Sequence, residues 1–210
     1  TNKGIKDFDV YFKNKEAFLD ALQYAYDNSF WCVALTSRAI TFKRNNGKLY
    51  QFMFFDWFET AHQIFEKFDF TACMAAIDLD SSELSAHPHF VSDLCKRKLR
   101  FNPGTEFPLG SAMRVRKYER KGFAIEDQEW LKVVMACSFR TPKNWEDLKN
   151  QIGGQYGDAV SIDTSKEFNL TNAVSSLATA IDSTCSVSGA KAENFDAAVA
   201  QIFPVHSTGT

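Results

Sequence analysis

Within residues 6–12, acidic and apolar side chains alternate at a period of two from Asp7 to Val10, with Asp7 and Asp9 on either side of Phe8. On a β-strand, residues two apart point to the same side of the sheet. The pattern therefore predicts a strand over residues 5–12 whose two carboxylates project together from one face. Adjacent carboxylates repel each other unless a cation lies between them, so both aspartates are candidate Mg²⁺ ligands.

An Asp-x-Asp pattern alone is weak evidence, because a solvated strand end produces the same sequence. A second one, Asp78-Leu79-Asp80, is followed by two serines and is typical of a turn. Evidence from the rest of the sequence is therefore needed to distinguish a metal site at Asp7 and Asp9 from a solvated strand end.

Hydrophobic periodicity predicts mixed structure in the first part of the chain. Asn45-Asn46-Gly47 lies between two β-rich runs and is typical of a hairpin turn. The expected elements are a strand over 5–12, a helix over 15–28, strands over 30–35, 39–44 and 48–55, a helix over 57–67, and a second hairpin formed by 72–77 and 83–86.

From residue 90 onward the sequence predicts helices only. Thr141 and Pro142 are expected to start one of them as cap and first residue, and Asn169 or Thr171 is expected to cap another. The expected helices cover residues 90–98, 110–121, 126–137, a segment ending at Gly153-Gly154, 171–182 and 193–203. The predicted fold class is therefore α+β, with a small mixed sheet and flanking helices followed by an all-α region.

The 210 residues suffice for one large domain or one domain with an appendage. Five dispersed cysteines without paired spacing favour reduced thiols in a cytosol-like compartment. No stretch has the apolar length of a membrane span. His87 and His89 are two imidazoles without a third ligand, which favours a polar loop over a zinc site.

Charge is distributed unevenly although the net charge is only −2. Residues 96–121 contain nine Lys and Arg against two Glu, whereas residues 151–210 are acidic and rich in Ala, Ser and Thr. A basic run is either a solvated helical face or a phosphate-binding surface. The aromatic run around Trp57 either fills the core or stacks on bases, and filling the core is the favoured interpretation.

Four motifs occur in order along the chain. The Asp7-Phe8-Asp9 strand is followed by Asp69-Phe70-Thr71, by a segment from Asp93 to Arg100, and by a segment from Met113 to Phe123. This order resembles the class II CCA-adding tRNA nucleotidyltransferase and poly(A) polymerase head-and-neck family, in the compact, divergent form seen in viruses and phages.

The resemblance implies a nucleotidyltransferase-type sheet, Mg²⁺ as cofactor, NTP as substrate and a tRNA-like RNA 3′ end as acceptor. Asp7 and Asp9 would be the catalytic metal ligands, and Asp69 and Thr71 would be a structural motif beside them. Four basic residues would bind nucleotide or RNA, namely Arg100, Arg114, Lys117 and Arg120.

Several family features are missing from this sequence. The triphosphate-binding Gly-Gly and Arg lie upstream of the Asp-x-Asp motif in the family, so we expect a segment before residue 1. Phe68 and Cys73 replace the family's Arg and Asn, Phe107 and Pro108 stand near the nucleotide-selecting template, and Gln51 occupies the expected place of a third strand carboxylate.

The first hypothesis is therefore that the protein is a template-independent nucleotidyltransferase acting on an RNA 3′ end. The alternative is a catalytically silent protein of the same fold that serves as a viral structural, accessory or nucleic-acid-binding component, and a third is a nucleotidyltransferase toxin. Predicted domains are a head (1–89), a basic helical neck (90–150) and an acidic extension (151–210) that suits a protein partner. We expect no membrane partner and a location in the cytoplasm, meaning the host cytoplasm or the virion for a viral protein.

Overall fold

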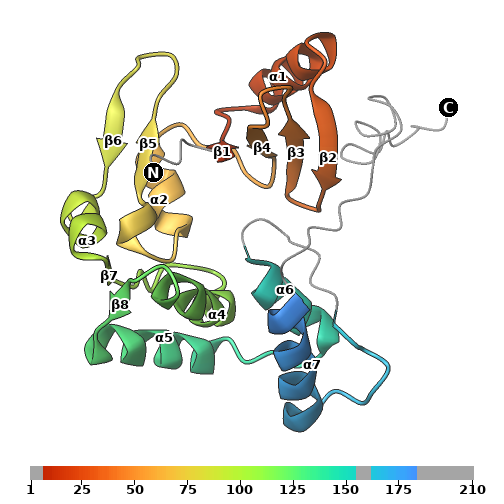
Figure 1. Ribbon diagram of the computed structural model, residues 1–210, viewed down its shortest axis with the longest axis vertical. Coiled ribbons are helices and arrows are strands. Elements are labelled where there is room, and N and C mark those ends of the chain that lie inside the picture. Colours follow the sequence, from red (N-terminus) through yellow and green to blue (C-terminus); the bar gives the residue numbers. More distant parts are fainter. Residues whose placement is uncertain (1–6, 155–161, 184–210) are drawn as a thin grey trace, which may run out of the picture. The chain divides into compact units, whose positions relative to one another are not determined.

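The computed structural model describes residues 7–154 and 162–183 (Figure 1). The described residues form two compact units, one ending at Trp57 and the second beginning at Phe58. Each unit is described by itself below. The predicted division into 1–89, 90–150 and 151–210 stays a prediction, because packing units and functional domains need not share boundaries.

The first unit is a four-stranded sheet with one helix. Its strand order is β1-β4-β3-β2, with β1 parallel to β4 and the other neighbours antiparallel (Figure 1). Gly47 closes the predicted β3–β4 hairpin with a positive φ of 77°, which a glycine adopts without strain. The elements are β1 (Asp7–Val10), α1 (Lys15–Asp27), β2 (Trp31–Leu35), β3 (Ala39–Lys43) and β4 (Leu49–Met53).

The strand register assigns each side chain to one of two faces, because laterally paired residues point to the same side. Phe8, Tyr50 and Phe42 form one lateral row, and the first two rings stack 5.1 Å apart. The next row, Asp9, Gln51 and Thr41, points the opposite way. We call this second side the Asp7 face, and at one end of it Ala34, Ala39 and Met53 are buried. Its other members by register are Asp7, Asp9, Leu49, Gln51, Thr41, Lys43 and Trp31.

An aromatic core holds α1 against the other face of the sheet. Phe18 and Leu22 of α1 are fully buried, and Phe12 packs edge-on against both Phe18 and Phe52 at centroid distances of 5.3 and 5.4 Å. Asn14 caps the helix by accepting a hydrogen bond from the Ala17 amide at 2.8 Å. Of the aromatic run around Trp57 that was predicted to fill the core, Phe52 is buried in this cluster, and Phe54 and Trp57 pack against it half-buried.

The second unit contains most of the helices and two minor sheets (Figure 1). The short antiparallel pair β5–β6 confirms the predicted second hairpin. The elements are α2 (Ala61–Lys67), the 3-10 helix η1 (Thr71–Cys73), β5 (Ala75–Ile77), β6 (Leu84–Ala86), α3 (Phe90–Lys96), β7 (Lys98–Leu99), α4 (Pro108–Glu119), β8 (Ala124–Ile125), α5 (Asp127–Phe139), α6 (Trp145–Gly153) and α7 (Leu170–Ser183).

The α+β class is confirmed, and two details of the prediction are wrong. The chain after residue 90 is not purely helical, because β7 and β8 pair as a two-residue parallel ladder. Thr141 does not cap α6; Asn144 does, accepting a hydrogen bond from the Asp147 amide at 2.8 Å. Asn169 is the cap of α7, as one of the two alternatives predicted. The helix expected over 193–203 lies outside the described residues.

Two hydrophobic clusters build the second unit. Phe70, Leu99, Phe101, Val115 and Val133 join η1, β7, α4 and α5, whereas Leu148, Ile162 and Ala173 join α6 and α7. None of the helices in the described part of the chain is long and apolar enough to span a membrane.

Helices α4 and α6 meet at Gly110. A Cβ atom at this position would lie 2.7 Å from the backbone oxygen of Gln151, closer than atoms pack without displacement. The α4–α6 contact therefore requires the absence of a side chain at position 110.

Gly110→Ala tests this contact, because helix propensity predicts a gain in the free energy of unfolding whereas packing predicts a loss. Alanine normally stabilises a helix by up to about 1 kcal/mol relative to glycine. Displacing backbone against backbone costs about 1–3 kcal/mol, so we expect a net loss of roughly 1 kcal/mol in the free energy of unfolding. Denaturant unfolding followed by circular dichroism measures this change, and a gain in stability would contradict the close approach.

Candidate functional site

Asp7 and Asp9 lie on the same side of β1. Both side chains are exposed, while Phe8 and Val10 between and after them are half-buried and turn toward the α1 core. The predicted placement of the two carboxylates on one face is thus confirmed. Their role as metal ligands stays a prediction.

Gln51 and Thr41 continue the row that starts at Asp9, one and two strands away. Gln51 therefore occupies the position next to the aspartates where a third carboxylate was expected, and its amide carries no charge. Among the residues that the structure describes, no three His, Cys, Asp or Glu side chains form a metal-binding group. Two exposed carboxylates fit a hard cation such as Mg²⁺, which prefers oxygen ligands and keeps several waters.

Arg100 lies in the second unit and binds a buried carboxylate. Asp93 is only 1% exposed and accepts hydrogen bonds from Arg100 Nε at 2.9 Å, Arg100 Nη2 at 3.3 Å and Thr71 Oγ1 at 2.6 Å. Burial alone raises the pKa of Asp93, but the hydrogen bonds from Arg100 and Thr71 reverse this and lower it below its ordinary value. The network ties η1 to α3 and to the segment after β7.

Arg114 joins a second polar cluster on α4. Its Nε lies 3.4 Å from the buried Asp69 carboxylate, and its Nη2 donates a hydrogen bond of 3.2 Å to the Tyr118 hydroxyl. The Tyr118 hydroxyl is in turn 2.8 Å from Cys73 Sγ. Arg100, Arg114, Asp69 and Thr71 therefore all hold structural contacts, and binding roles for the two arginines stay predictions.

Burial governs the ionisation of this cluster. It raises the pKa of Asp69, an effect that the nearby Arg114 charge opposes. Burial also raises the pKa values of Cys73 and Tyr118 above their ordinary range. A thiol held in its neutral form is a poor nucleophile, so Cys73 is not suited to that role.

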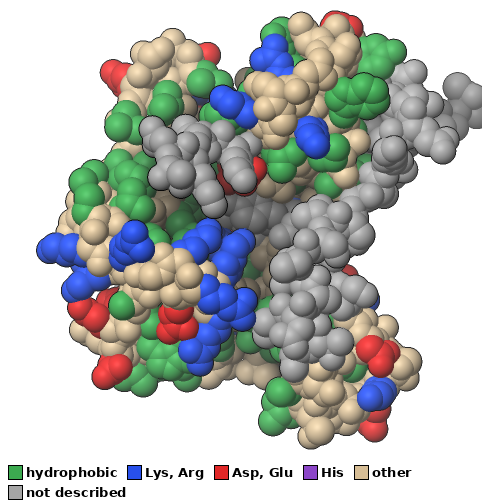
Figure 2. Space-filling view, viewed as in Figure 1, with side chains coloured by type: hydrophobic (Ala, Val, Ile, Leu, Met, Phe, Trp, Pro, Cys, Tyr) green, Lys and Arg blue, Asp and Glu red, His purple; other side chains and the backbone are tan. Residues whose placement is uncertain are grey.

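Lys117 in α4 and Arg120 directly after it have exposed side chains. Figure 2 shows Lys and Arg side chains gathered over the region that Figure 1 assigns to α3, β7 and α4. Arg97, at the end of α3, donates a hydrogen bond to the Lys121 carbonyl at 3.1 Å, which connects the two ends of this basic surface. We use the term basic surface for the Lys and Arg residues of 96–121.

Two weaker candidates behave as the simpler interpretations predict. Asp78 Oδ1 accepts hydrogen bonds from the amides of Asp80 and Ser81, so the second Asp-x-Asp motif forms a turn. The His87 and His89 rings lie 5.6 Å apart, and His87 Nδ1 accepts a hydrogen bond from the His89 amide. This geometry suits a local turn rather than two ligands of one metal.

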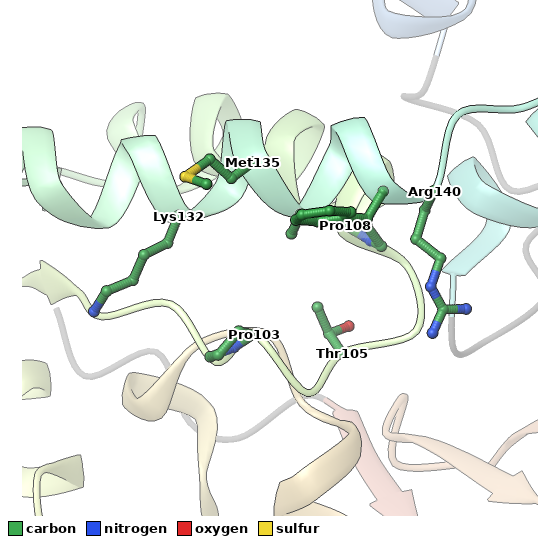
Figure 3. Close-up of a pocket in the computed structure, with 8 residues that line it drawn as sticks. Pro103, Thr105, Pro108, Lys132, Met135 and Arg140 are labelled. Atoms are coloured by element: carbon green, nitrogen blue, oxygen red, sulfur yellow. The ribbon is translucent and has the colours of Figure 1, made fainter.

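Sequence reasoning missed an apolar surface on α5. Exposed hydrophobic side chains follow one side of this helix, and two of them border a pocket of about 280 Å³ beneath it (Figure 3). Lys132 and Arg140 flank the same pocket. The available signal was the unbroken apolar run of residues 133–137, which is long enough to place apolar side chains on every side of a helix. The exposed side chains are Trp130, Leu131, Val134, Met135 and Phe139.

The comparisons with known proteins show similarity to a phage protein. Residues 1–97 match the model of the Gabija anti-defense 2 family. Over 181 residues the chain is 35% identical to "Gabija anti-defense 2" of Bacillus phage SPbetaL7. The match covers 84% of this chain and 45% of the phage protein, so the chain spans less than half the length of this relative.

Two solved structures are also similar to the chain, both at 16% identity. The Thermotoga maritima CCA-adding enzyme complexed with tRNA has a TM-score of 0.49 and is matched over 85% of this chain and 42% of its own. The apo form of a tRNA-processing enzyme has a TM-score of 0.47, with 71% and 40% covered.

Asp93→Asn tests the buried network through its pH dependence. We expect the free energy of unfolding at pH 7 to fall by about 2 kcal/mol, since a charged hydrogen-bond pair is lost but the half-exposed Arg100 regains water. Because folding lowers the pKa of Asp93, the carboxylate stabilises the protein above its unfolded pKa of about 3.9 and stops doing so as the pH falls through the folded value.

The stability difference between the original protein and Asp93→Asn should therefore shrink in acid. Urea unfolding at pH 7 and pH 3 measures it, with the exposed α1 residue Asp20 changed to Asn as the control. A difference that stays constant with pH would show that the charge of Asp93 does not contribute.

Proposed function

We propose that the protein transfers a nucleotide from an NTP to the 3′ end of an RNA without a template, releasing pyrophosphate. The observation that carries this proposal is the pair of exposed carboxylates, Asp7 and Asp9, on one face of a strand in a mixed sheet. The order of the four sequence motifs supports it. The similarity to a phage protein agrees with the compact, phage-like version of the family.

Asp7 and Asp9 would hold Mg²⁺ through their carboxylate oxygens. When bound, the cation polarises the phosphoryl oxygens and favours the ionised form of the attacking hydroxyl. In the reaction, the 3′ oxygen of the acceptor forms a bond to the α-phosphorus, the bond to the β-phosphate oxygen breaks, and the hydroxyl proton passes to water. Gln51, beside Asp9, donates or accepts hydrogen bonds but takes up no proton.

The basic surface would bind the RNA backbone. Lys117 and Arg120 are basic residues with exposed side chains. Such residues attract phosphates without reading the sequence. NTP, an RNA 3′ end and, through residues 151–210, a protein partner are the binding partners of this proposal, with action in the host cytoplasm or the virion.

The relative's name favours a second candidate function. The phage relative is named as an anti-defence protein, and the present chain would contribute to an anti-defence task. A catalytically silent protein of this fold would do so by binding alone. The uncharged Gln51 beside Asp9 is the structural feature that favours this alternative.

Asp7→Asn and Asp9→Asn, made singly and together, test the enzyme proposal. Asparagine keeps the shape of the side chain but removes the charge that attracts a divalent cation. We expect transfer of labelled nucleotide from each NTP to short RNAs, with Mg²⁺ present, to fall at least about 100-fold, equivalent to about 2.7 kcal/mol in the barrier. Gel separation of the labelled RNAs measures the transfer.

The matched control is Asp80→Asn, which changes the other Asp-x-Asp motif and should leave transfer unchanged. Transfer that survives the double change would remove Asp7 and Asp9 from the mechanism. No transfer by the original protein with any NTP, combined with protection of phage in bacteria that carry Gabija defence, would favour the silent alternative.

Lys117→Ala and Arg120→Ala test the basic surface. For single-stranded RNA, the logarithm of the affinity falls with the logarithm of the salt concentration, and each lost phosphate contact makes that slope shallower by about 0.7. Fluorescence anisotropy of a labelled oligonucleotide at several salt concentrations measures the slope. Lys143→Ala, outside the basic surface, is the control, and an unchanged slope in both test variants would exclude them from RNA binding.

A further inference from the structure

The lateral row that begins at Asp7 continues across the whole sheet. Asp7 pairs with Leu49 of β4, Leu49 with Lys43 of β3, and Lys43 with Trp31 of β2. Laterally paired side chains share a face, so the acidic, the cationic and the aromatic group of this row all belong to the Asp7 face. The irregularity in the β2–β3 ladder begins after Cys32 and leaves the Trp31–Lys43 pair in register.

The neighbouring row confirms this assignment of faces. Cys32 pairs with Phe42, which pairs with Tyr50, and all three side chains pack in the α1 core. Adjacent residues on a strand point to opposite sides. Trp31 and Lys43 therefore point away from α1, toward the side that carries Asp7.

Trp31 is 66% exposed at the edge of the sheet, and Lys43 beside it is exposed as well. An exposed indole is a platform on which a base of any identity can stack. A lysine at the paired position of the neighbouring strand places a mobile positive charge within reach of the phosphate attached to such a base. The pair has the chemistry that single-stranded nucleic acid requires.

The spacing of the row fits a polynucleotide whose end lies at Asp7. Strands lie about 4.8 Å apart, so Lys43 is about 10 Å and Trp31 about 14 Å from Asp7 along the row. At about 3.4 Å per stacked nucleotide, this length corresponds to roughly four nucleotides, and to fewer if the strand is extended. The base of the incoming NTP is only one ribose away from its reacting phosphate, so Trp31 is placed for a base further along the acceptor.

We propose that Trp31 and Lys43 bind the single-stranded 3′ segment of the acceptor across the Asp7 face, with its terminal hydroxyl at Asp7 and Asp9. This assignment rests on the proposed function for the location of the reacting end. Trp31 stacks on a base, and Lys43 binds a backbone phosphate. The pair recognises the strand by stacking and charge, without selecting a base sequence.

Binding of a fluorescein-labelled oligoadenylate RNA to the full chain, in Ca²⁺ to prevent turnover, tests the assignment. We expect Trp31→Ala to weaken binding about tenfold, and Trp31→Phe to restore most of it because a ring can still stack. Lys43→Ala should weaken binding several-fold and make the salt dependence shallower by about 0.7. The affinity for an NTP, measured by competition with a fluorescent analogue, should not change in these variants.

The matched controls lie on the other side of the sheet. Tyr24, an exposed aromatic residue of α1, and Lys48, whose Nζ lies 5.3 Å from the Phe8 ring centre, are each changed to Ala and should leave RNA binding unaffected. Melting temperatures check that every variant is folded.

Each outcome decides the assignment separately from the proposed function. RNA binding that is absent in the original protein, or unchanged in Trp31→Ala and Lys43→Ala, overturns it. A loss of NTP affinity in Lys43→Ala, with RNA affinity retained, overturns it in favour of a triphosphate contact. Loss of RNA binding in both variants supports it even where no nucleotide transfer is detected, in which case only the proposed catalysis fails.

Discussion

The parallel pairing of β1 with β4 is the constraint on which the proposed chemistry depends. It sets Asp9 beside Gln51 and Asp7 beside Leu49, and thereby determines which side chains share the Asp7 face. A slip of one residue would turn both carboxylates toward the aromatic core, where charged groups are costly. The stacked pair of Phe8 and Tyr50 in the adjacent row stabilises the observed register.

The second unit uses charge in a different way. Asp93, Asp69 and Glu129 are buried, and each is paired with a basic side chain or a backbone amide. Such pairs hold segments that are distant in sequence in fixed positions, as the Glu129 carboxylate does by accepting a hydrogen bond from the Phe101 amide. Arg100 and Arg114 serve this internal order, whereas Lys117 and Arg120 are exposed to solvent. The basic residues of 96–121 therefore include some that hold the fold together and others that are exposed and could contact a ligand.

Local patterns were sufficient to predict much of the fold. The alternation around Asp7, the helical period of α1 and the Asn-Asn-Gly turn each depend on residues close together in sequence, and all three are confirmed. The cap of α6 was predicted wrongly because Thr141 and Asn144 are both good caps, and only tertiary packing decides where a helix starts.

The contents of the candidate site were harder to predict, because they depend on strand order. Periodicity shows that Asp7 and Asp9 share a face, but it does not show that Trp31 and Lys43 lie in the same row, since lateral neighbours are set by pairing across the sheet. The hydrogen bond between Thr71 and Asp93 likewise joins residues 22 positions apart and leaves no local signature.

The exposed side of α5 has a consequence for how this sequence is expected to vary. Val133 is fully buried and constrained by packing. Leu131, Met135 and Phe139 are exposed and therefore contribute little to the stability of the fold. Random drift would replace such solvent-facing hydrophobic residues with polar ones at almost no cost in stability. If bulky apolar residues persist at these positions in related sequences, they are selected for binding rather than for folding.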